Sequence, residues 1–120
     1  MCIFEHMSGI KVRVVTFYKS YFEDFFQKQK PKVQEKIIWT LRLIETQKNI
    51  PTNYLKHLEG TNGLYEIRIQ FGNDIFRIFC FFDEGKIIVL TNGFQKKTQS
   101  TPQTEILKAL KIKKEYEQEK

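Results

Sequence analysis

The chain has 120 residues, of which 41% are hydrophobic and 11 are phenylalanine, and its 20 Lys and Arg against 14 Asp and Glu give a formal net charge of +6. This length and apolar fraction predict one domain with its own packed core, which excludes a disordered tail and a multidomain protein. The longest apolar run, residues 78–82, is far shorter than the roughly 20 residues of a membrane-spanning helix, so we expect no membrane segment.

The first nine residues lack the basic flank and apolar stretch of a secretion signal. We expect residues 1–9 to be a disordered leader, native or introduced, and residues 10–120 to form the single domain. Cys2 and Cys80 are too few for a disulfide scaffold, which favours a reducing compartment and predicts a cytoplasmic location. With His6 and His57 as the only histidines, no pair stands at metal-ligand spacing, so we expect neither a metal nor another cofactor.

The first half of the chain predicts one strand and two helices. Residues 11–17 alternate with β-branched side chains, as in a strand. Ser20 precedes Glu23 at the spacing of a capping box, and phenylalanines follow at helical spacing. Pro31 then suits the first turn of a longer amphipathic helix, and residues 51–63, rich in Asn, Gly and Pro, are expected to be mostly loop.

The second half predicts three strands in a meander and a closing helix. Residues 64–71 alternate between apolar and polar side chains, and residues 75–82 are apolar on both faces except at Arg77. The latter strand should therefore be central, with helices on one face and strand or loop on the other. Residues 86–94 follow as a third strand, and a helix begins after Thr101-Pro102, with its tail frayed beyond residue 113. The expected fold is α+β, in the order β-α-α-β-β-β-α, with a small antiparallel-dominated sheet packed against helices in two layers.

Arg77 is the strongest candidate for a functional side chain. A guanidinium among apolar neighbours is costly to desolvate unless it meets an anion or reaches the surface. One interpretation is a salt bridge to Glu66 across the hairpin, and the other is an arginine that faces a phosphate. If the three strands pair in sequence, Arg68, Lys96 and Lys97 would converge with Arg77 on one face and suit a phosphate group.

Other residues allow both a functional and a structural interpretation. His57 has a pKa range suited to acid-base chemistry, although a single loop histidine is more often without a role. The basic flanks suggest contacts with RNA phosphates, or else a solvated surface. The residues that we expect to contact RNA are Lys28, Lys30, Lys32, Phe94 and Thr98. Nearly all the other phenylalanines fall on apolar faces. Those expected in the core are Phe22, Phe25, Phe26, Phe79 and Phe81.

Several segments together resemble a known family. They are residues 56–68 (KHLEGTNGLYEIR), 76–79 (FRIF), 93–99 (GFQKKTQ), Thr101-Pro102 and Ala109 in the last helix. In this order, over about residues 11–116, they closely resemble the HigB-like branch of the RelE/ParE toxin superfamily.

The resemblance implies the toxin of a type II toxin-antitoxin pair, an enzyme that cleaves mRNA in the ribosomal decoding site without a metal. Arg77 would match the arginine that stabilises the phosphorane, and Arg68 and Lys96 or Lys97 would match further basic positions. Glu66 stands where some relatives carry lysine, and the tyrosine of RelE proper has no counterpart, so Glu66, His57 and a perturbed lysine all remain candidates for the general base and acid.

The partners implied are a cognate antitoxin with a helix-turn-helix domain, similar to HigA, and the ribosome with its mRNA. Operator DNA would be bound only through the antitoxin. Two alternatives remain open at this point: a ParE-like inhibitor of DNA gyrase, and a non-catalytic RNA-binding adaptor.

Overall fold

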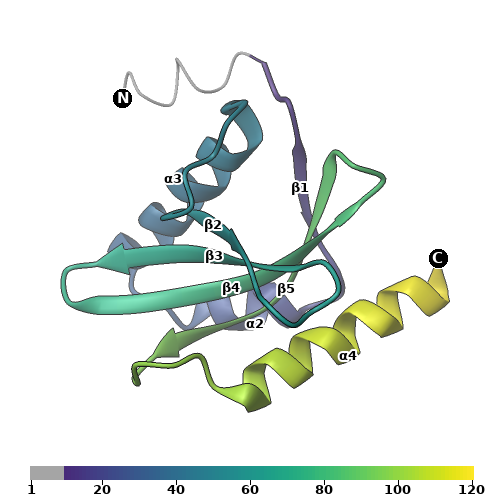
Figure 1. Ribbon diagram of the computed structural model, residues 1–120. Coiled ribbons are helices and arrows are strands. Elements are labelled where there is room, and N and C mark those ends of the chain that lie inside the picture. The colour runs from purple at the N-terminus through teal and green to yellow at the C-terminus, as the bar shows by residue number, and fades with distance from the viewer. Residues whose placement is uncertain (1–9) are drawn as a thin grey trace.

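The computed structural model describes residues 10–120, which form an α+β domain (Figure 1). The predicted leader, residues 1–9, lies outside the described residues. In chain order the elements are β1 (Val14–Phe17), α2 (Tyr21–Gln27), α3 (Pro31–Thr46), β2 (Leu55–His57), β3 (Leu64–Phe71), β4 (Asp74–Asp83), β5 (Ile87–Lys96) and α4 (Gln103–Glu119). No helix in this part of the chain is long and apolar enough to cross a membrane.

The strands form one five-stranded sheet in the order β1-β5-β4-β3-β2, in which β1 runs parallel to β5 and the other pairs are antiparallel. The predicted meander of β3, β4 and β5 is confirmed, and β4 is the central strand, as its two apolar faces predicted. The prediction that residues 51–63 are mostly loop is confirmed, although the short strand Leu55–His57 within them, which pairs with the edge of β3, was not predicted. With only three residues, β2 is too short to show a sequence period.

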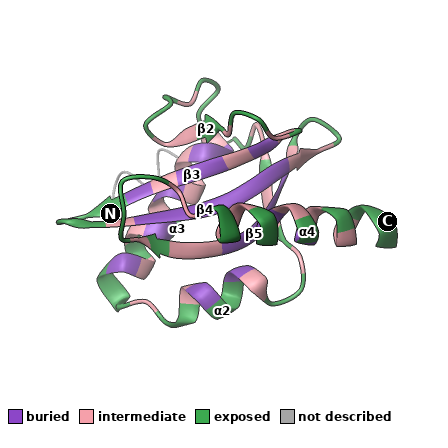
Figure 2. Cartoon of the chain, turned by 60° about the horizontal axis from the view of Figure 1, so that its bottom comes forward, coloured by how far each residue is buried: buried purple, intermediate pink, exposed green. Residues whose placement is uncertain are grey.

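Helices cover both faces of the sheet, so the expectation of two layers was wrong. On one face, α2 and α3 bury a large cluster that includes Phe25, Ile37 and Ile78. On the other face, α4 packs through Ala109 against Phe79 in a smaller cluster. In Figure 2 the central strands are mostly buried, whereas α4 is exposed or intermediate along most of its length. Because α4 covers this second face only in part, the face has room for polar side chains.

Four of the five phenylalanines predicted as core are buried and Phe26 is partly buried against the same cluster, whereas two local predictions were wrong. Phe22, Phe25, Phe79 and Phe81 are all buried. The strand predicted over residues 11–17 begins only at Val14. The capping box predicted at Ser20 is absent, because the Ser20 side chain makes no hydrogen bond to the backbone of α2.

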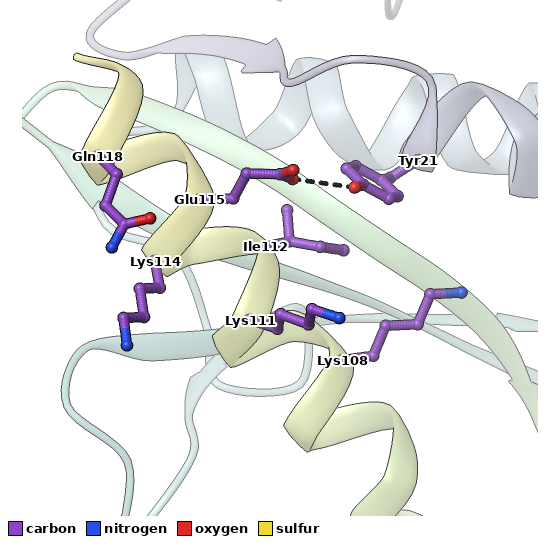
Figure 3. Close-up of a pocket in the computed structure, with 7 residues that line it drawn as sticks. All are labelled: Tyr21, Lys108, Lys111, Ile112, Lys114, Glu115 and Gln118. Atoms are coloured by element: carbon purple, nitrogen blue, oxygen red, sulfur yellow. Dashed lines mark hydrogen bonds between the residues drawn. The ribbon is translucent and has the colours of Figure 1, made fainter.

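The C-terminal part of α4 is held in place, so the expected fraying beyond residue 113 was wrong. The Tyr21 hydroxyl donates to Glu115 at 2.9 Å (Figure 3), and the Tyr116 hydroxyl donates to Asp83 at 2.6 Å. Lys120 also donates to Asp83, at 2.5 Å. These polar partners come from the start of α2 and the end of β4, so the tail of α4 is bound to segments distant in sequence.

The anchoring of α4 by Asp83 predicts a loss of stability in acid. The Lys120 ammonium and then the Tyr116 hydroxyl lower the pKa of Asp83 below its ordinary 3.8. A carboxyl whose pKa is lowered by folding stabilises the fold above its unfolded pKa, and this stabilisation is lost as the pH falls through the folded value. We expect Asp83→Asn to lower the melting temperature at pH 6, and the difference from wild type to shrink below about pH 4. A constant difference between pH 6 and pH 2.5 in thermal melts would contradict this role.

Candidate active site

Arg77 lies on the sheet face that α4 partly covers, and it is buried, with 5% of its surface exposed. Its Nη1 donates to the Phe76 carbonyl at 3.1 Å, and its Nε lies 3.7 Å from Glu66 Oε1. That separation is too long for a hydrogen bond, and neither atom makes one to any residue of 10–120. Burial lowers the pKa of Arg77, and the nearby Glu66 carboxylate offsets part of the shift. The salt bridge considered for Arg77 and Glu66 is thus present as an ion pair, in which Arg77 Nε and Glu66 Oε1 make no hydrogen bond within residues 10–120.

Arg68 pairs directly with Arg77 across the β3–β4 ladder. Directly opposed residues project from the same face, so two guanidinium groups lie side by side. Glu66 lies between them, with Oε2 3.6 Å from Arg68 Nε. One carboxylate therefore forms ion pairs with two arginines, so the three side chains together carry a net positive charge.

A bulge in β5 brings Lys96 to the same face. Cys80 pairs with Leu90 but Ile78 pairs with Gly93, so two residues of β5 stand opposite one residue of β4. Before the bulge, Leu90 packs in the cluster under α2 and α3. After it the alternation is shifted, and Lys96 faces the Arg77 side.

The bulge residues are held by specific hydrogen bonds. The Thr91 hydroxyl donates to the Phe79 carbonyl at 3.2 Å. The Asn92 amide donates to the carbonyl and the carboxylate of Glu105 at 3.2 and 2.9 Å, which also attaches the start of α4 to the sheet. These contacts fix the shift in alternation on which the position of Lys96 depends.

Lys96 responds electrostatically to the other members of the site. Partial burial is the largest cause that lowers the pKa of Lys96, and the positive charge of Arg77 is the next largest. The Glu66 carboxylate raises this pKa and offsets part of the shift. Arg68 and Lys56 lower it further. We call the group Lys56, Glu66, Arg68, Arg77 and Lys96 the cation cluster.

Lys56 is a member of the cation cluster that we did not predict as a site residue. It is exposed on β2 and pairs with Glu66 in the ladder, so it projects from the same face. β2 has only three residues and lies in a stretch rich in Gly and Asn, so it carries no strand pattern of its own. The one signal was the long alternation of β3, which indicates a strand that could pair with a further strand on its free edge.

Two residues predicted as catalytic, His57 and Lys97, are not members of the cation cluster. His57 follows Lys56 on the same strand and therefore points to the opposite face, where its ring packs on Tyr65 with a centroid distance of 5.1 Å. Lys97 follows the last residue of β5 and is exposed. The structure therefore brings together Arg68, Arg77, Lys96 and Glu66 out of the six residues that we predicted as catalytic.

The residues predicted to contact RNA are dispersed. Lys28, Lys30 and Lys32 are exposed around the α2–α3 connection, which belongs to the layer on the opposite face. Phe94 is half-buried on the Arg77 face, with its ring 5.4 Å from that of Phe79. Thr98 is exposed and donates to the Ser100 carbonyl at 2.8 Å.

Two open pockets lie beside positive charge. A pocket of about 400 Å³ is lined by Arg68 and Arg77 of the cation cluster and by Lys36 of α3. A second pocket, of about 610 Å³, lies between α2 and α4 (Figure 3), where Lys108, Lys111 and Lys114 project from α4. The first pocket adjoins the cation cluster, whereas the second is lined by residues of α2 and α4 alone.

The chemistry of the cation cluster suits an anion that carries several oxygens. Guanidinium groups offer paired donors to phosphate oxygens, and charges held by a sheet stabilise developing negative charge without reorganising. No group of three or more His, Cys, Asp or Glu within residues 10–120 is arranged to hold a metal ion.

The mixed sheet with helices on both faces and the cation cluster on one of them define an α+β protein of the RelE-like fold. The chain belongs to the family described as "Phage derived protein Gp49-like (DUF891)", whose profile matches residues 24–114. Family and fold together support the resemblance to the RelE/ParE superfamily.

One similar solved structure is the archaeal RelE-RelB complex from Pyrococcus horikoshii OT3. The TM-score is 0.53 at 16% sequence identity, and the match covers 75% of this chain and 99% of that chain. At this identity the likeness concerns the fold alone. No curated protein matches the sequence.

Proposed function

We propose that this protein is the toxin of a type II toxin-antitoxin pair, of the HigB-like kind, and that it cleaves mRNA on the ribosome without a metal. The observation that carries the proposal is Arg77, a buried arginine with unused hydrogen-bonding capacity at the centre of the cation cluster. A purely structural arginine would be expected to have its donors satisfied. Membership of the Gp49-like family and the RelE-like fold support the proposal.

In the proposed reaction the ribose 2′-oxygen attacks the adjacent phosphorus and the bond from phosphorus to the 5′-oxygen breaks. The products are a 2′,3′-cyclic phosphate and a free 5′-hydroxyl. The 2′-hydroxyl proton passes to a general base, and the leaving oxygen receives a proton from a general acid. Arg77 and Arg68 would bind the non-bridging oxygens, whose negative charge grows in the transition state.

Lys96 and Glu66 are the residues best placed to carry these protons. Both belong to the cation cluster, and the lowered pKa of Lys96 favours release of a proton to a leaving oxygen. His57 and Lys97 could act only if the substrate extended beyond this face, since neither belongs to the cation cluster.

The proposed partners follow from the same function. A cognate antitoxin with a helix-turn-helix domain, similar to HigA, would neutralise the toxin and carry the complex to operator DNA. The similar archaeal RelE was solved in complex with RelB, which supports a protein partner for this chain. The ribosome with its mRNA would be the target, and the location would be the cytoplasm.

The lysines of α4 are proposed to bind rRNA phosphates. Lys108, Lys111 and Lys114 recur every three residues and line the pocket shown in Figure 3. We expect a variant with all three changed to glutamine to bind ribosomes more weakly at 100 mM salt, and its dependence of log affinity on log salt to be shallower by about two to three. Sedimentation binding between 50 and 300 mM salt measures both quantities. An unchanged slope would contradict phosphate contacts by α4.

The proposed function is tested directly in a translation extract. The purified protein should cleave a reporter mRNA that is being translated, with the Mg²⁺ that ribosomes need kept present and transition metals removed by a selective chelator, and leave cyclic phosphate and 5′-hydroxyl ends. The same mRNA should stay intact without ribosomes. Cleavage that requires a divalent metal beyond the ribosome's own, or no cleavage of translated mRNA, would refute the proposal.

A further inference from the structure

The 400 Å³ pocket lies beside β3, next to the residues that precede the first residue of β2. The Arg68 amide donates to the Tyr54 carbonyl at 2.9 Å, and past this bond the chain before β2 turns away. Asn53 and Tyr54, Lys36 of α3 and residues of β3 and β4 line the pocket.

The Tyr54 side of the pocket is held rigidly. The Tyr54 amide donates to the Pro51 carbonyl at 2.9 Å, and its ring lies 5.9 Å from that of Trp39. The Lys36 ammonium lies 5.0 Å from the Trp39 ring, so α3 and the turn support each other. A ring fixed in this way can bind a flat ligand with little loss of entropy.

The pocket combines apolar and polar groups. Ile69 is buried and Ile75 half-buried, whereas the amides of Asn53 and Gln70 are exposed. A primary amide offers both donors and acceptors, as the edge of a nucleobase does. The pocket volume falls within the ordinary range for sites that bind small molecules.

We infer that this pocket binds the nucleoside next to the phosphate held by the cation cluster, and that it selects the base of that nucleotide. The inference rests on the proposed function for its substrate, single-stranded RNA. Arg68 and Arg77 line the pocket and also form the cation cluster, so a phosphate at the arginines places an attached nucleoside at its mouth. Tyr54 stacks on the base, as aromatic side chains do on unstacked RNA bases, while Asn53 and Gln70 contact the base edge.

The choice of base is tested by mapping cleavage in translated reporter mRNAs that carry all codons. Tyr54→Ala is expected to lower cleavage at preferred sites about tenfold or more through the loss of stacking. Asn53→Ala and Gln70→Ala are expected to redistribute cleavage among bases. Asn49→Ala removes an exposed amide after α3 that does not line the pocket and serves as the matched control. A site preference unchanged in all three pocket variants would overturn the inference while leaving the proposed function intact.

A second measurement does not depend on cleavage. The four ribonucleoside 5′-monophosphates are titrated into isotope-labelled protein, with inorganic phosphate as the reference probe. Amide shifts at Asn53, Tyr54 and Gln70 that differ between bases are expected. Such shifts would support the pocket even if the protein failed to cleave mRNA. Shifts identical to those of inorganic phosphate, confined to the arginines, would overturn it.

Discussion

Replacing Arg77 by alanine is expected to relieve growth arrest and to reduce mRNA cleavage at least a hundredfold, while ribosome binding is largely retained. Removing one preorganised donor from a developing oxyanion typically costs about 10² to 10³ in rate. Arg77 is central to the cation cluster, whereas the lysines proposed to bind rRNA lie on α4. The expected result therefore separates catalysis from docking. Cleavage in the translation extract and sedimentation with ribosomes measure the two quantities.

A loss of activity could also follow from unfolding, because Arg77→Ala removes one of the two arginines that form ion pairs with the buried Glu66. Arg77→Lys keeps a charge but removes the planar fork, so it should fold and still cleave poorly. Circular dichroism and thermal melts serve as the folding control. Cleavage by Arg77→Lys at the wild-type rate would show that the guanidinium geometry has no role, and cleavage by a folded Arg77→Ala would exclude Arg77 from catalysis.

Gly93→Ala is expected to destabilise the fold by about 1 to 3 kcal/mol through overpacking. A Cβ at this position would lie 2.5 Å from Cδ2 and 2.7 Å from Cγ of Phe25, a buried ring of the core. Gly93 also marks the end of the bulge that brings Lys96 to the cation cluster. The substitution should therefore lower both the free energy of unfolding and the activity, and denaturant titration gives the first of these.

The steric cause is tested by shortening the opposing side chain. Phe25→Leu alone should be destabilising, but Gly93→Ala combined with Phe25→Leu should lose less than the sum of the two single changes, by about 0.5 kcal/mol or more. Strict additivity of the two free-energy changes would mean that the ring of Phe25 is not what excludes a side chain at Gly93.

The central strand and its arginine could be predicted from the sequence because their signal is local. Residues 75–82 are apolar on both faces, and the one cation among them stands out against the cost of burying a charge. Arg68 and Glu66 followed from the simple alternation of β3. For the same reason, the core phenylalanines were predicted correctly.

The second helical layer and the bulge that turns Lys96 toward Arg77 could not be predicted in the same way. A bulge has no period of its own, and one extra residue in β5 reverses which side chains face Arg77. The apolar side of α4 is narrow, with only Ala109 and Ile112 buried, and its tail is held by polar contacts to distant segments. His57 was grouped with the catalytic residues from its chemistry, but the three-residue strand turns it to the other face.

The central claim is that the cation cluster cleaves mRNA during translation, and mapping new mRNA 5′ ends after induction without antitoxin tests it most directly. The expected result is new ends that cluster at fixed positions within codons, disappear when translation is blocked, and are absent on induction of Arg77→Ala. Intact mRNA together with supercoiling-defective DNA would point to gyrase as the target, and intact mRNA with undamaged DNA would point to an RNA-binding adaptor. Either of these results would contradict the proposed function.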